Sequence, residues 1–371
     1  MSESGHFIIT YHITGNSLEE AEDKAGKLCV EQTVEMPVEA VPGRIQTGYL
    51  SKIDSIIEID ENRFELIVKC PLPSAGTEIS QFINIVYGNI SLTPGIKLMN
   101  IDWTSLTDNV QGPNFGIAGI RENLNIFGRA LSCTALKPIG LTTNELADLC
   151  YKFALSGLDI IKDDHGLSNQ ESSPFEERVE ACCRAVDRAA QKTGKKTVYY
   201  PNITSDSEEI FDRFEFAKRE GAGGVLIAPQ ITGLTTMHAL ARRRELPVMA
   251  HPSFTGSYLI NSESGIDAGF YYGSFWRALG ADSVIFTNAH GRFNFTENEV
   301  LSIAHHARDE SQPFQTSLPT PGGGIDRNSV RKWLDFYGID TLFLIGGSLY
   351  IHPEGLQTAA REFQNKLESN D

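Results

Sequence analysis

The sequence is poor in basic residues, lacks long apolar runs and has no CxxC pair of cysteines. Its 371 residues include 32 Lys and Arg against 48 Asp and Glu, which gives a net charge of −16. Such an acidic chain does not attract phosphate over its whole surface, so we expect neither a nucleic-acid partner nor an anionic membrane surface. No stretch approaches about 18 consecutive apolar residues, so we expect no membrane-spanning helix.

The first residues and the cysteines indicate a reducing compartment. The segment MSESGHFIITYH lacks the basic and apolar parts of a secretory signal peptide, so none is expected. Scattered cysteines without a CxxC pair are typical of small core side chains in a cytoplasmic protein. The six are Cys29, Cys70, Cys133, Cys150, Cys182 and Cys183.

The first 125 residues mix strand and helix patterns without regular alternation. Residues 6–13 and 96–102 read as strands, 55–68 as a hairpin with its turn at 60–62, and 17–33 and 77–89 as helices. We therefore expect a small α+β domain of ferredoxin-like type over residues 1–125, with one sheet covered by two helices.

From residue 126 onward, short apolar strands alternate with amphipathic helices. Capping boxes at Thr142, Ser205 and Thr296, and a Ser173-Pro174 start, signal four of the helices. Strands that are apolar on both faces and separated by helices are parallel, and eight of them predict a (β/α)8 barrel over residues 126–371. A doubly wound sheet is the rival, but no GxGxxG follows the first strand. The eight expected strands are 130–136, 158–162, 197–203, 223–228, 246–251, 283–288, 313–319 and 341–347.

Polar residues follow most of these strands, and the active site of such a barrel lies at the carboxyl ends of its strands. These residues include Lys137, Lys162 to His165, Asn202, His251, Asn288, His290, Arg292 and two glycine clusters. Charged residues that converge on one face of the barrel predict an enzyme. Its active site would lie at that face, which we call the mouth of the barrel.

The glycine clusters at the ends of strands 7 and 8 predict a phosphate site. They are Gly322, Gly323 and Gly324 after one strand, and Gly346 and Gly347 after the next. Glycine lets backbone N–H groups approach an anion closely, and two such loops at neighbouring strand ends favour phosphate over simple tight turns. We therefore expect a phosphorylated small-molecule substrate.

The stretch GLDIIKDDHG ends strand 2 with four ionisable residues. A lysine at the end of an apolar strand loses its proton easily, and the neutral amine can act as a base, a nucleophile or a carbamate-forming group. Asp164 and His165 add an oxygen and a nitrogen ligand for a divalent metal. A solvated loop is the alternative, and the place on strand 2 favours a site; Asp163 is expected to be a structural neighbour.

At this point the chain resembles the ribulose bisphosphate carboxylase (RuBisCO) superfamily. GLDIIKDDHG is similar to the family's GGLDFTKDDE motif, and further segments match it: GPNFGIAGIRENLNIFGR, CTALKPIGL, PNIT, PGGGI and GGSLYIHP. The resemblance implies an N-terminal α+β domain, a C-terminal barrel, and homodimers whose active sites are shared between chains.

The resemblance also implies a role for each matched residue. Lys162 matches the carbamylated lysine and, with Asp164 and His165, would bind Mg²⁺. Lys137 matches the first-strand catalytic lysine, His251 the strand 5 histidine and Arg292 the lysine of the mobile loop 6. Gly323, Gly324, Gly346 and Gly347 match the phosphate sites, and Glu31 and Asn89 match residues that reach the partner's active site.

Three departures from the family pattern indicate a RuBisCO-like protein that does not fix CO2. His165 stands where the third metal ligand is a glutamate. KPIGL is shorter than the family's KPKLGL and lacks its second lysine, and Pro252 stands where an arginine holds the second phosphate. One phosphate site, a metal and a lysine remain, which suffice to stabilise an enediolate.

Several substrates fit an enolate-forming enzyme of this kind. The segment CVEQTVEMP, with Glu31, favours decarboxylation or C–C cleavage of a 3-oxoisoapionate 4-phosphate. AHPSFTG resembles the 2,3-diketo-5-methylthiopentyl-1-phosphate enolases of methionine salvage, and methylthioribulose 1-phosphate isomerases are further relatives in the superfamily. The replacement of glutamate by His165 also leaves open a non-catalytic, phosphate-ligand-binding or regulatory descendant.

Overall fold

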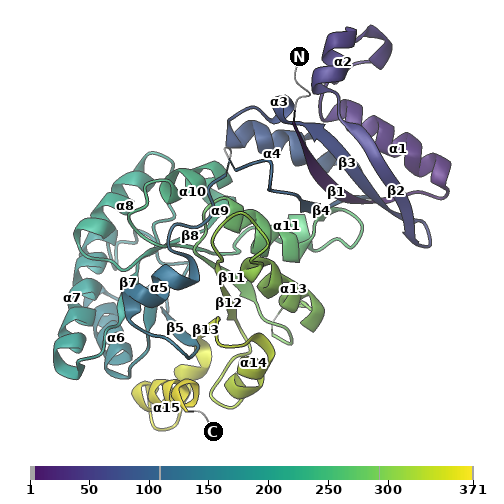
Figure 1. The fold of residues 1–371 in the computed structure, drawn as a ribbon. Coiled ribbons are helices and arrows are strands. Elements are labelled where there is room, and N and C mark those ends of the chain that lie inside the picture. Colours follow the sequence, from purple (N-terminus) through teal and green to yellow (C-terminus); the bar gives the residue numbers. More distant parts are fainter. Residues whose placement is uncertain (1–4, 108–109, 292, 370–371) are drawn as a thin grey trace. The chain divides into compact units, whose positions relative to one another are not determined.

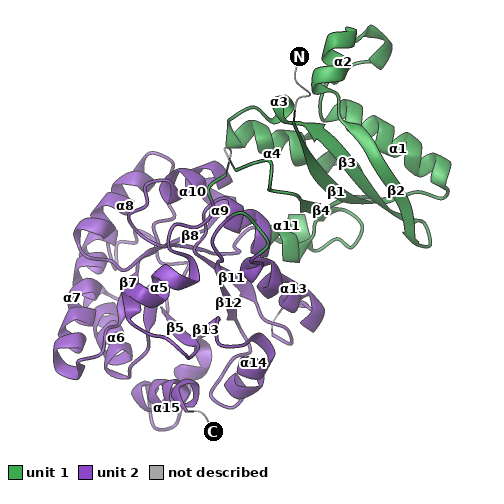
Figure 2. Ribbon diagram, viewed as in Figure 1, with its two compact units in different colours: residues 1–111, 255–271, 311–313 green, residues 112–254, 272–310, 314–371 purple. Residues whose placement is uncertain are grey.

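The computed structural model describes residues 5–107, 110–291 and 293–369. The chain forms two compact units, of which unit 1 comprises residues 1–111, 255–271 and 311–313, and unit 2 comprises residues 112–254, 272–310 and 314–371 (Figure 2). The division falls before Gly112 rather than at the expected 125/126 boundary, because Ile120 and Leu124 belong to the core of the second unit.

Unit 1 is an α+β domain with the strand order β10-β4-β1-β3-β2, in which β1 to β4 have the ferredoxin-like arrangement (Figure 1). The hairpin β2–β3 turns at the expected residues. The short β10 comes from a distant part of the chain and pairs in parallel with β4, which the sequence pattern did not predict. The elements are β1 (His6–Thr14), α1 (Leu18–Glu31), η1 (Val38–Ala40), α2 (Gly43–Tyr49), β2 (Lys52–Asp60), β3 (Arg63–Pro71), α3 (Leu72–Ala75), α4 (Ile79–Tyr87), η2 (Asn89–Leu92), β4 (Ile96–Ile101), α11 (Gly256–Leu259) and β10 (Gly265–Ile266).

The core of unit 1 follows from the alternation of β1. Phe7, Ile9, Tyr11 and Ile13 are all buried, whereas the residues between them are partly exposed. The Tyr11 hydroxyl donates to the C=O of Val86 in α4 at 2.6 Å, so the alternation fixes the face against which α4 packs.

Unit 2 is an eight-stranded parallel barrel whose strands appear in chain order around the ring (Figure 1). A bridge between Asn202 and Leu226 joins β7 to β8 and completes the circuit. The elements are α5 (Gly116–Leu124), β5 (Leu131–Leu136), α6 (Thr143–Leu155), β6 (Ile160–Asp163), α7 (Phe175–Thr193), β7 (Val198–Tyr200), α8 (Glu209–Arg219), β8 (Val225–Ile227), α9 (Pro229–Thr232), α10 (Leu234–Ala241), β9 (Val248–Ala250), a π-helix η3 (Gly269–Phe275) that begins in unit 1, α12 (Trp276–Ala278), β11 (Ser283–Thr287), α13 (Glu297–Arg308), β12 (Leu318–Gly322), α14 (Val330–Tyr337), β13 (Leu342–Ile345), η4 (Gly347–Leu349) and α15 (Leu356–Glu368).

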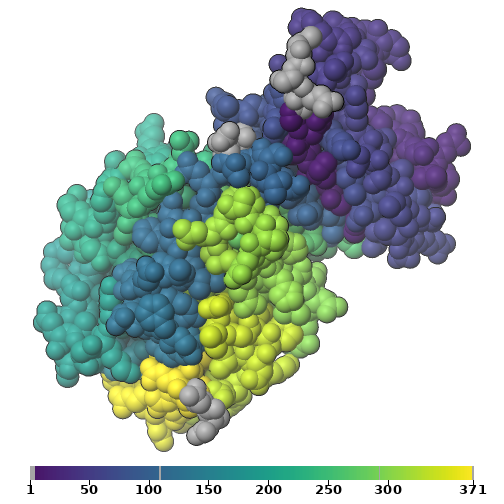
Figure 3. Space-filling view, in the orientation of Figure 1, coloured from purple at the N-terminus to yellow at the C-terminus, as the bar shows by residue number. Residues whose placement is uncertain are grey.

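The interior of the barrel is a packed apolar core. Leu131, Cys133, Ile160, Leu226 and Ile285 belong to one buried cluster, to which α5 adds two side chains. In the space-filling view the blue atoms of the segment around α5 cover the middle of the near face of unit 2 (Figure 3). The barrel is therefore closed at this end, which leaves the opposite strand ends for chemistry.

Two of the four expected helix starts are confirmed. Thr142 and Thr296 each form a reciprocal capping box with the glutamate three residues later. The helices expected at Ser173 and Ser205 are present, but the capping by these serines is wrong: α7 begins after Pro174 and α8 after Glu208, without a side-chain cap. The seventh strand is also shifted: it spans Leu318–Gly322 instead of residues 313–319.

The burial of the cysteines and the character of the helices agree with the sequence-based expectations. All six cysteines are buried and free, as expected of core side chains. No helix within the described ranges combines the length and the apolar character needed to cross a bilayer.

A buried ion pair fixes the outer side of β6, and its loss should be costly. Arg178 Nε lies 3.1 Å from Asp163 Oδ2, and both side chains are fully buried. We expect Arg178→Met to lower the free energy of unfolding by about 3–5 kcal/mol, because the Asp163 carboxylate then stays buried without its cation. Urea unfolding monitored by circular dichroism measures the change.

Arg184→Met is the matched control, since Arg184 pairs with Glu180 on the exposed side of the same helix. Its loss should cost less than about 0.5 kcal/mol. If the two substitutions lowered the free energy of unfolding equally, the buried ion pair would contribute no more to stability than the exposed one.

Candidate active site

The charged residues expected at the mouth of the barrel meet around the end of β6. Lys162 is the penultimate residue of β6, and Asp164 and His165 follow this strand directly. Lys137 follows the neighbouring strand β5, and His251 follows β9. Three strands thus bring five of the expected side chains to one end of the barrel.

Lys162 is buried within the barrel, with 1% of its surface exposed. Its Nζ donates to the C=O of Asp163 at 3.0 Å. Burial lowers the pKa of Lys162, while Cys133 and Asp164 act in the opposite direction. A lysine whose charged form is penalised in this way supplies the neutral amine that carbamate formation requires.

Asp164 lies between two possible partners. Its Oδ1 is 3.4 Å from Lys137 Nζ and 3.5 Å from His165 Nδ1. Burial alone would raise the pKa of Asp164, but the contact with His165 and the charges of Lys162 and Lys137 hold it well below its usual range. Asp164 is therefore a carboxylate at neutral pH.

The two histidines of the mouth stack on each other. The rings of His165 and His251 lie 4.5 Å apart at 17°. Burial lowers the pKa of His251 well below its usual value, and the charges of Lys162 and His165 add to this effect. The Nδ1 of His251 accepts from the N–H of Ser253 at 3.2 Å, so the proton of its neutral ring sits on Nε2.

Asp163 points away from this group and has a structural role, as expected. Its carboxylate accepts hydrogen bonds from Arg178, from the Tyr199 hydroxyl at 2.6 Å and from the N–H of Asn202 at 3.0 Å. The amide of Asn202 in turn donates to the C=O groups of His165 and Leu167. This network fixes the loop that carries Asp164 and His165.

The donor set fits a divalent cation only when Lys162 takes part. Among the described residues, no group of three His, Cys, Asp or Glu side chains has the geometry of a metal site. Asp164 Oδ1 and His165 Nδ1 are nevertheless close to the roughly 3 Å that separates adjacent ligands of an octahedral Mg²⁺. A carbamate on Lys162 would supply the missing oxygen next to them.

The glycine loops lie side by side at the ends of β12 and β13. Gly322 pairs with Leu344, so the two neighbouring strands deliver both loops to the same edge. The Cβ directions of Gly323, which has φ +88°, and of Gly347 point into open space. The backbone around both residues is thus accessible to an anion, as a phosphate cradle requires.

In unit 1, the structure brings the two expected residues together. Glu31 ends α1 and Asn89 begins η2, and the Asn89 amide donates to Glu31 Oε1 at 2.9 Å. Gln32 supports this pair, because its buried side chain bonds to the C=O of Ile85 and the N–H of Ile90. Both Glu31 and Asn89 are exposed and available to another molecule.

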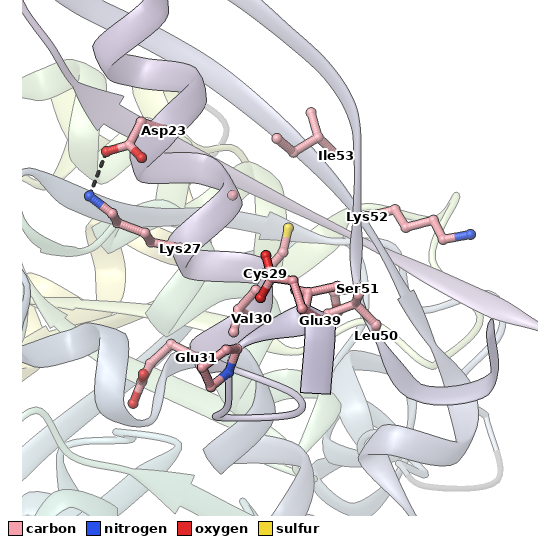
Figure 4. Close-up of a pocket in the computed structure, with 13 residues that line it drawn as sticks. Asp23, Lys27, Cys29, Val30, Glu31, Glu39, Leu50, Ser51, Lys52 and Ile53 are labelled. Carbon is pink, nitrogen blue, oxygen red and sulfur yellow. Dashed lines mark hydrogen bonds and ion pairs between the residues drawn. The ribbon is translucent and has the colours of Figure 1, made fainter. Parts of the chain in front are cut away.

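A pocket of about 730 Å³ in unit 1 does not coincide with the expected catalytic residues. It lies between α1 and the start of β2, and Glu31 is one of its lining residues. Asp23 and Lys27 form an ion pair on one side, and the Lys52 amine extends away (Figure 4). Because its lining includes no lysine or glycine of the barrel mouth, we take the strand ends as the site.

Some residues fall outside the expectations. Arg292, matched to the loop 6 lysine, lies outside the described residues. Ser253, whose hydroxyl lies 2.9 Å from His251 Nδ1, was not predicted, although its position two residues after the histidine is a recognisable signal. His352, which follows the glycine loop after β13, accepts from the N–H of Glu354 through Nδ1.

Comparisons with known proteins agree with this geometry. Residues 116–370 match the family model of the ribulose bisphosphate carboxylase large chain, catalytic domain. The chain is 35% identical to ribulose bisphosphate carboxylase-like protein 1 of Rhodopseudomonas palustris, over 100% of both chains. It is 36% identical to the 5-methylthioribulose-1-phosphate isomerase of Rhodospirillum rubrum, over 88% of this chain and 87% of that protein.

Solved structures are similar over nearly the whole chain. A RuBisCO-like protein from Rhodopseudomonas palustris has a TM-score of 0.89 at 34% identity, with 98% of each chain covered. A RuBisCO-like protein from Alicyclobacillus acidocaldarius has the same TM-score at 25% identity, with 98% of this chain and 94% of that one covered. The sequence match, the barrel with its ferredoxin-like unit and the cluster at the end of β6 together identify the chain as a member of the RuBisCO large-chain family, in its RuBisCO-like branch.

Proposed function

We propose that this chain is a metal-dependent enolate-forming enzyme that acts on a monophosphorylated keto sugar or keto sugar acid. The observation that carries the proposal is the group formed by Lys137, Asp164 and His165 beside the buried Lys162. Within the superfamily, relatives named as an isomerase and as enolases support enzymatic activity over a purely structural role.

The metal ligands, the glycine loops and His251 have different roles at the mouth. A bound Mg²⁺, held by Asp164, His165 and carbamylated Lys162, would supply positive charge that stabilises negative charge on a substrate oxygen. The glycine loops after β12 and β13 bind the phosphate through backbone N–H groups. His251, neutral and protonated on Nε2, donates a hydrogen bond to a substrate oxygen.

Lys137 moves the proton. In an isomerisation or enolisation, the Lys137 amine takes the proton from the carbon beside the carbonyl; the C–H electrons form the new C=C bond, and the C=O π electrons move onto the carbonyl oxygen. In a decarboxylation, the C–C bond to the carboxylate breaks, CO2 leaves, the bond electrons form an enolate, and the Lys137 ammonium then gives a proton to its carbon. Lys137 Nζ lies 3.4 Å from Asp164 Oδ1, which places it beside the other groups of the mouth.

The substrate class follows from the single phosphate cradle and the absence of an arginine at position 252. Glu31, in the segment CVEQTVEMP, favours decarboxylation or C–C cleavage of a 3-oxoisoapionate 4-phosphate. A second candidate is isomerisation of 5-methylthioribulose 1-phosphate, because a protein with that activity is 36% identical over 88% of this chain. The enolase reaction on 2,3-diketo-5-methylthiopentyl 1-phosphate is third, since its named relatives are about 30% identical.

A homodimer with shared sites fits the surfaces of both units. Exposed apolar side chains follow five different strands of the barrel; they are Ile139, Ile231, Phe254, Phe293 and Ile351. In unit 1, Leu92 is 85% exposed near the Glu31–Asn89 pair. Apolar groups around a polar centre are typical of protein interfaces, so we propose that a second copy supplies Glu31 and Asn89. A cytoplasmic location remains a prediction from the free cysteines.

A substrate panel tests the proposed activity. We expect one of the three phosphorylated compounds to turn over with Mg²⁺ but not with excess EDTA, whereas ribulose 1,5-bisphosphate should incorporate no labelled CO2. Lys137→Met should lower kcat at least about 100-fold, because it removes the group that carries the proton. Mass spectrometry and phosphorus NMR measure the products.

Lys152→Met is the matched control, since this lysine pairs with Asp148 on the surface of α6. It should leave kcat unchanged. If the wild-type chain binds the phosphorylated compounds but converts none of them, the enzyme proposal is wrong and the binding-protein alternative stands.

A metal titration tests the ligand set without any substrate. We expect Mn²⁺ to bind in bicarbonate buffer, and His165→Ala to weaken its affinity at least about tenfold, because the site loses one ligand. Lys162→Met should remove binding, since it cannot form the carbamate. Calorimetry and the electron paramagnetic resonance of Mn²⁺ report the affinity, and His305→Ala on the surface of α13 is the control. Unchanged affinity in His165→Ala would exclude this residue as a ligand.

Mixed dimers test the shared site. Chains with Glu31→Gln and chains with Lys162→Met should each be inactive alone. A heterodimer purified through two different tags should regain about half of the wild-type activity, because one of its two sites then has both residues intact. A heterodimer that stays inactive would contradict shared sites.

A further inference from the structure

The pairing of β5 with β13 ends before the carboxyl end of β5, and a tyrosine hydroxyl bonds to the β5 backbone beyond that point. Their pairing ends at Ile345 and Thr134, after which the chain turns into the glycine loop. The Tyr350 hydroxyl, which follows that loop, donates to the C=O of Ala135 at 3.0 Å. Burial raises the pKa of Tyr350, and the backbone N–H of Lys137 opposes this rise, which puts that N–H beside the phenol oxygen.

This phenol takes the place of a strand partner. In a parallel ladder, alternate backbone groups of a strand bond to its neighbour, and β13 no longer supplies them beyond Ile345. The ring of Tyr350 is held against Phe153 of α6, edge to face, with centroids 6.0 Å apart. Its hydroxyl is therefore held in position by packing as well as by hydrogen bonding.

The Lys137 side chain extends from the same point toward the other groups of the mouth. Its Nζ lies 3.4 Å from Asp164 Oδ1. A Cβ built on Gly346 would lie 4.0 Å from the same amine, so the lysine also borders the expected phosphate loop. The position of this amine thus depends on how the backbone of residues 135–137 is held.

We propose that Tyr350 is a positioning residue, which fixes the end of β5 and thereby sets the place of the Lys137 amine between Asp164 and the glycine loop. This rests on the proposed function, in which Lys137 carries the proton. Because the same short segment bears the glycines and Tyr350, it links the phosphate cradle to the proton-transferring group.

Tyr350→Phe tests the inference, because it removes one oxygen and keeps the ring packed on Phe153. We expect kcat to fall at least about tenfold while KM stays within about threefold, since the phosphate loop remains but the amine is displaced. Tyr11→Phe is the matched control: that buried phenol also donates to a backbone C=O, in unit 1. Both variants should melt within a few degrees of the wild type.

A second measurement needs no substrate. The rate at which trinitrobenzenesulfonate labels Lys137, followed by peptide mass spectrometry, should rise at least about threefold in Tyr350→Phe and stay unchanged in Tyr11→Phe. If the wild type converts no compound of the panel, the proposed function fails and the labelling rate alone decides this inference. A Tyr350→Phe variant with wild-type kcat, or with an unchanged labelling rate, would overturn it.

Discussion

The arrangement of the mouth depends on the alternation of side chains along β6 and on the ion pair that fixes its outer face. Successive residues of a strand point to opposite sides, so Lys162 and Asp164 point into the barrel while Asp163 points outward. The outward carboxylate is bound by Arg178, Tyr199 and the N–H of Asn202. A register shift of one residue would bring Asp163 inward and turn Lys162 and Asp164 outward, so this buried network keeps Lys162 and Asp164 facing the mouth.

Much of the architecture could be predicted because hydrophobic periodicity determines strand and helix. The failures have local physical causes. Ser173 does not cap α7, because its hydroxyl lies 3.0 Å from that of Thr143 instead. The seventh strand lies later than expected and contains Pro319 and Pro321, which lack an N–H and are unusual in a central strand. They are tolerated because β12 pairs with β13 only where Gly322 meets Leu344, while its ladder with β11 is complete.

The candidate site could be predicted only as far as strand order determines it. Lys137, Lys162 and His251 follow from the rule that strand ends converge. The stacking of His165 on His251 and the contact of Tyr350 with the end of β5 do not, because they join loops whose shapes the periodicity leaves open. The same loops surround the substrate, which is why the sequence predicts the chemistry of the mouth more sharply than the compound it binds.

His165 changes the charge of the proposed ligand set as well as its chemistry. With a carboxylate at this position, the set would carry three negative charges when Lys162 is a carbamate; with a neutral imidazole it carries two. Two negative ligand charges would neutralise the charge of a divalent cation, whereas three would exceed it. The mouth would therefore repel an additional anion less. A keto acid brings such an anion in its own carboxylate, close to the carbonyl that must be polarised. The departure from the carboxylase pattern at His165 would thus suit the carboxylate of the sugar acid proposed as substrate.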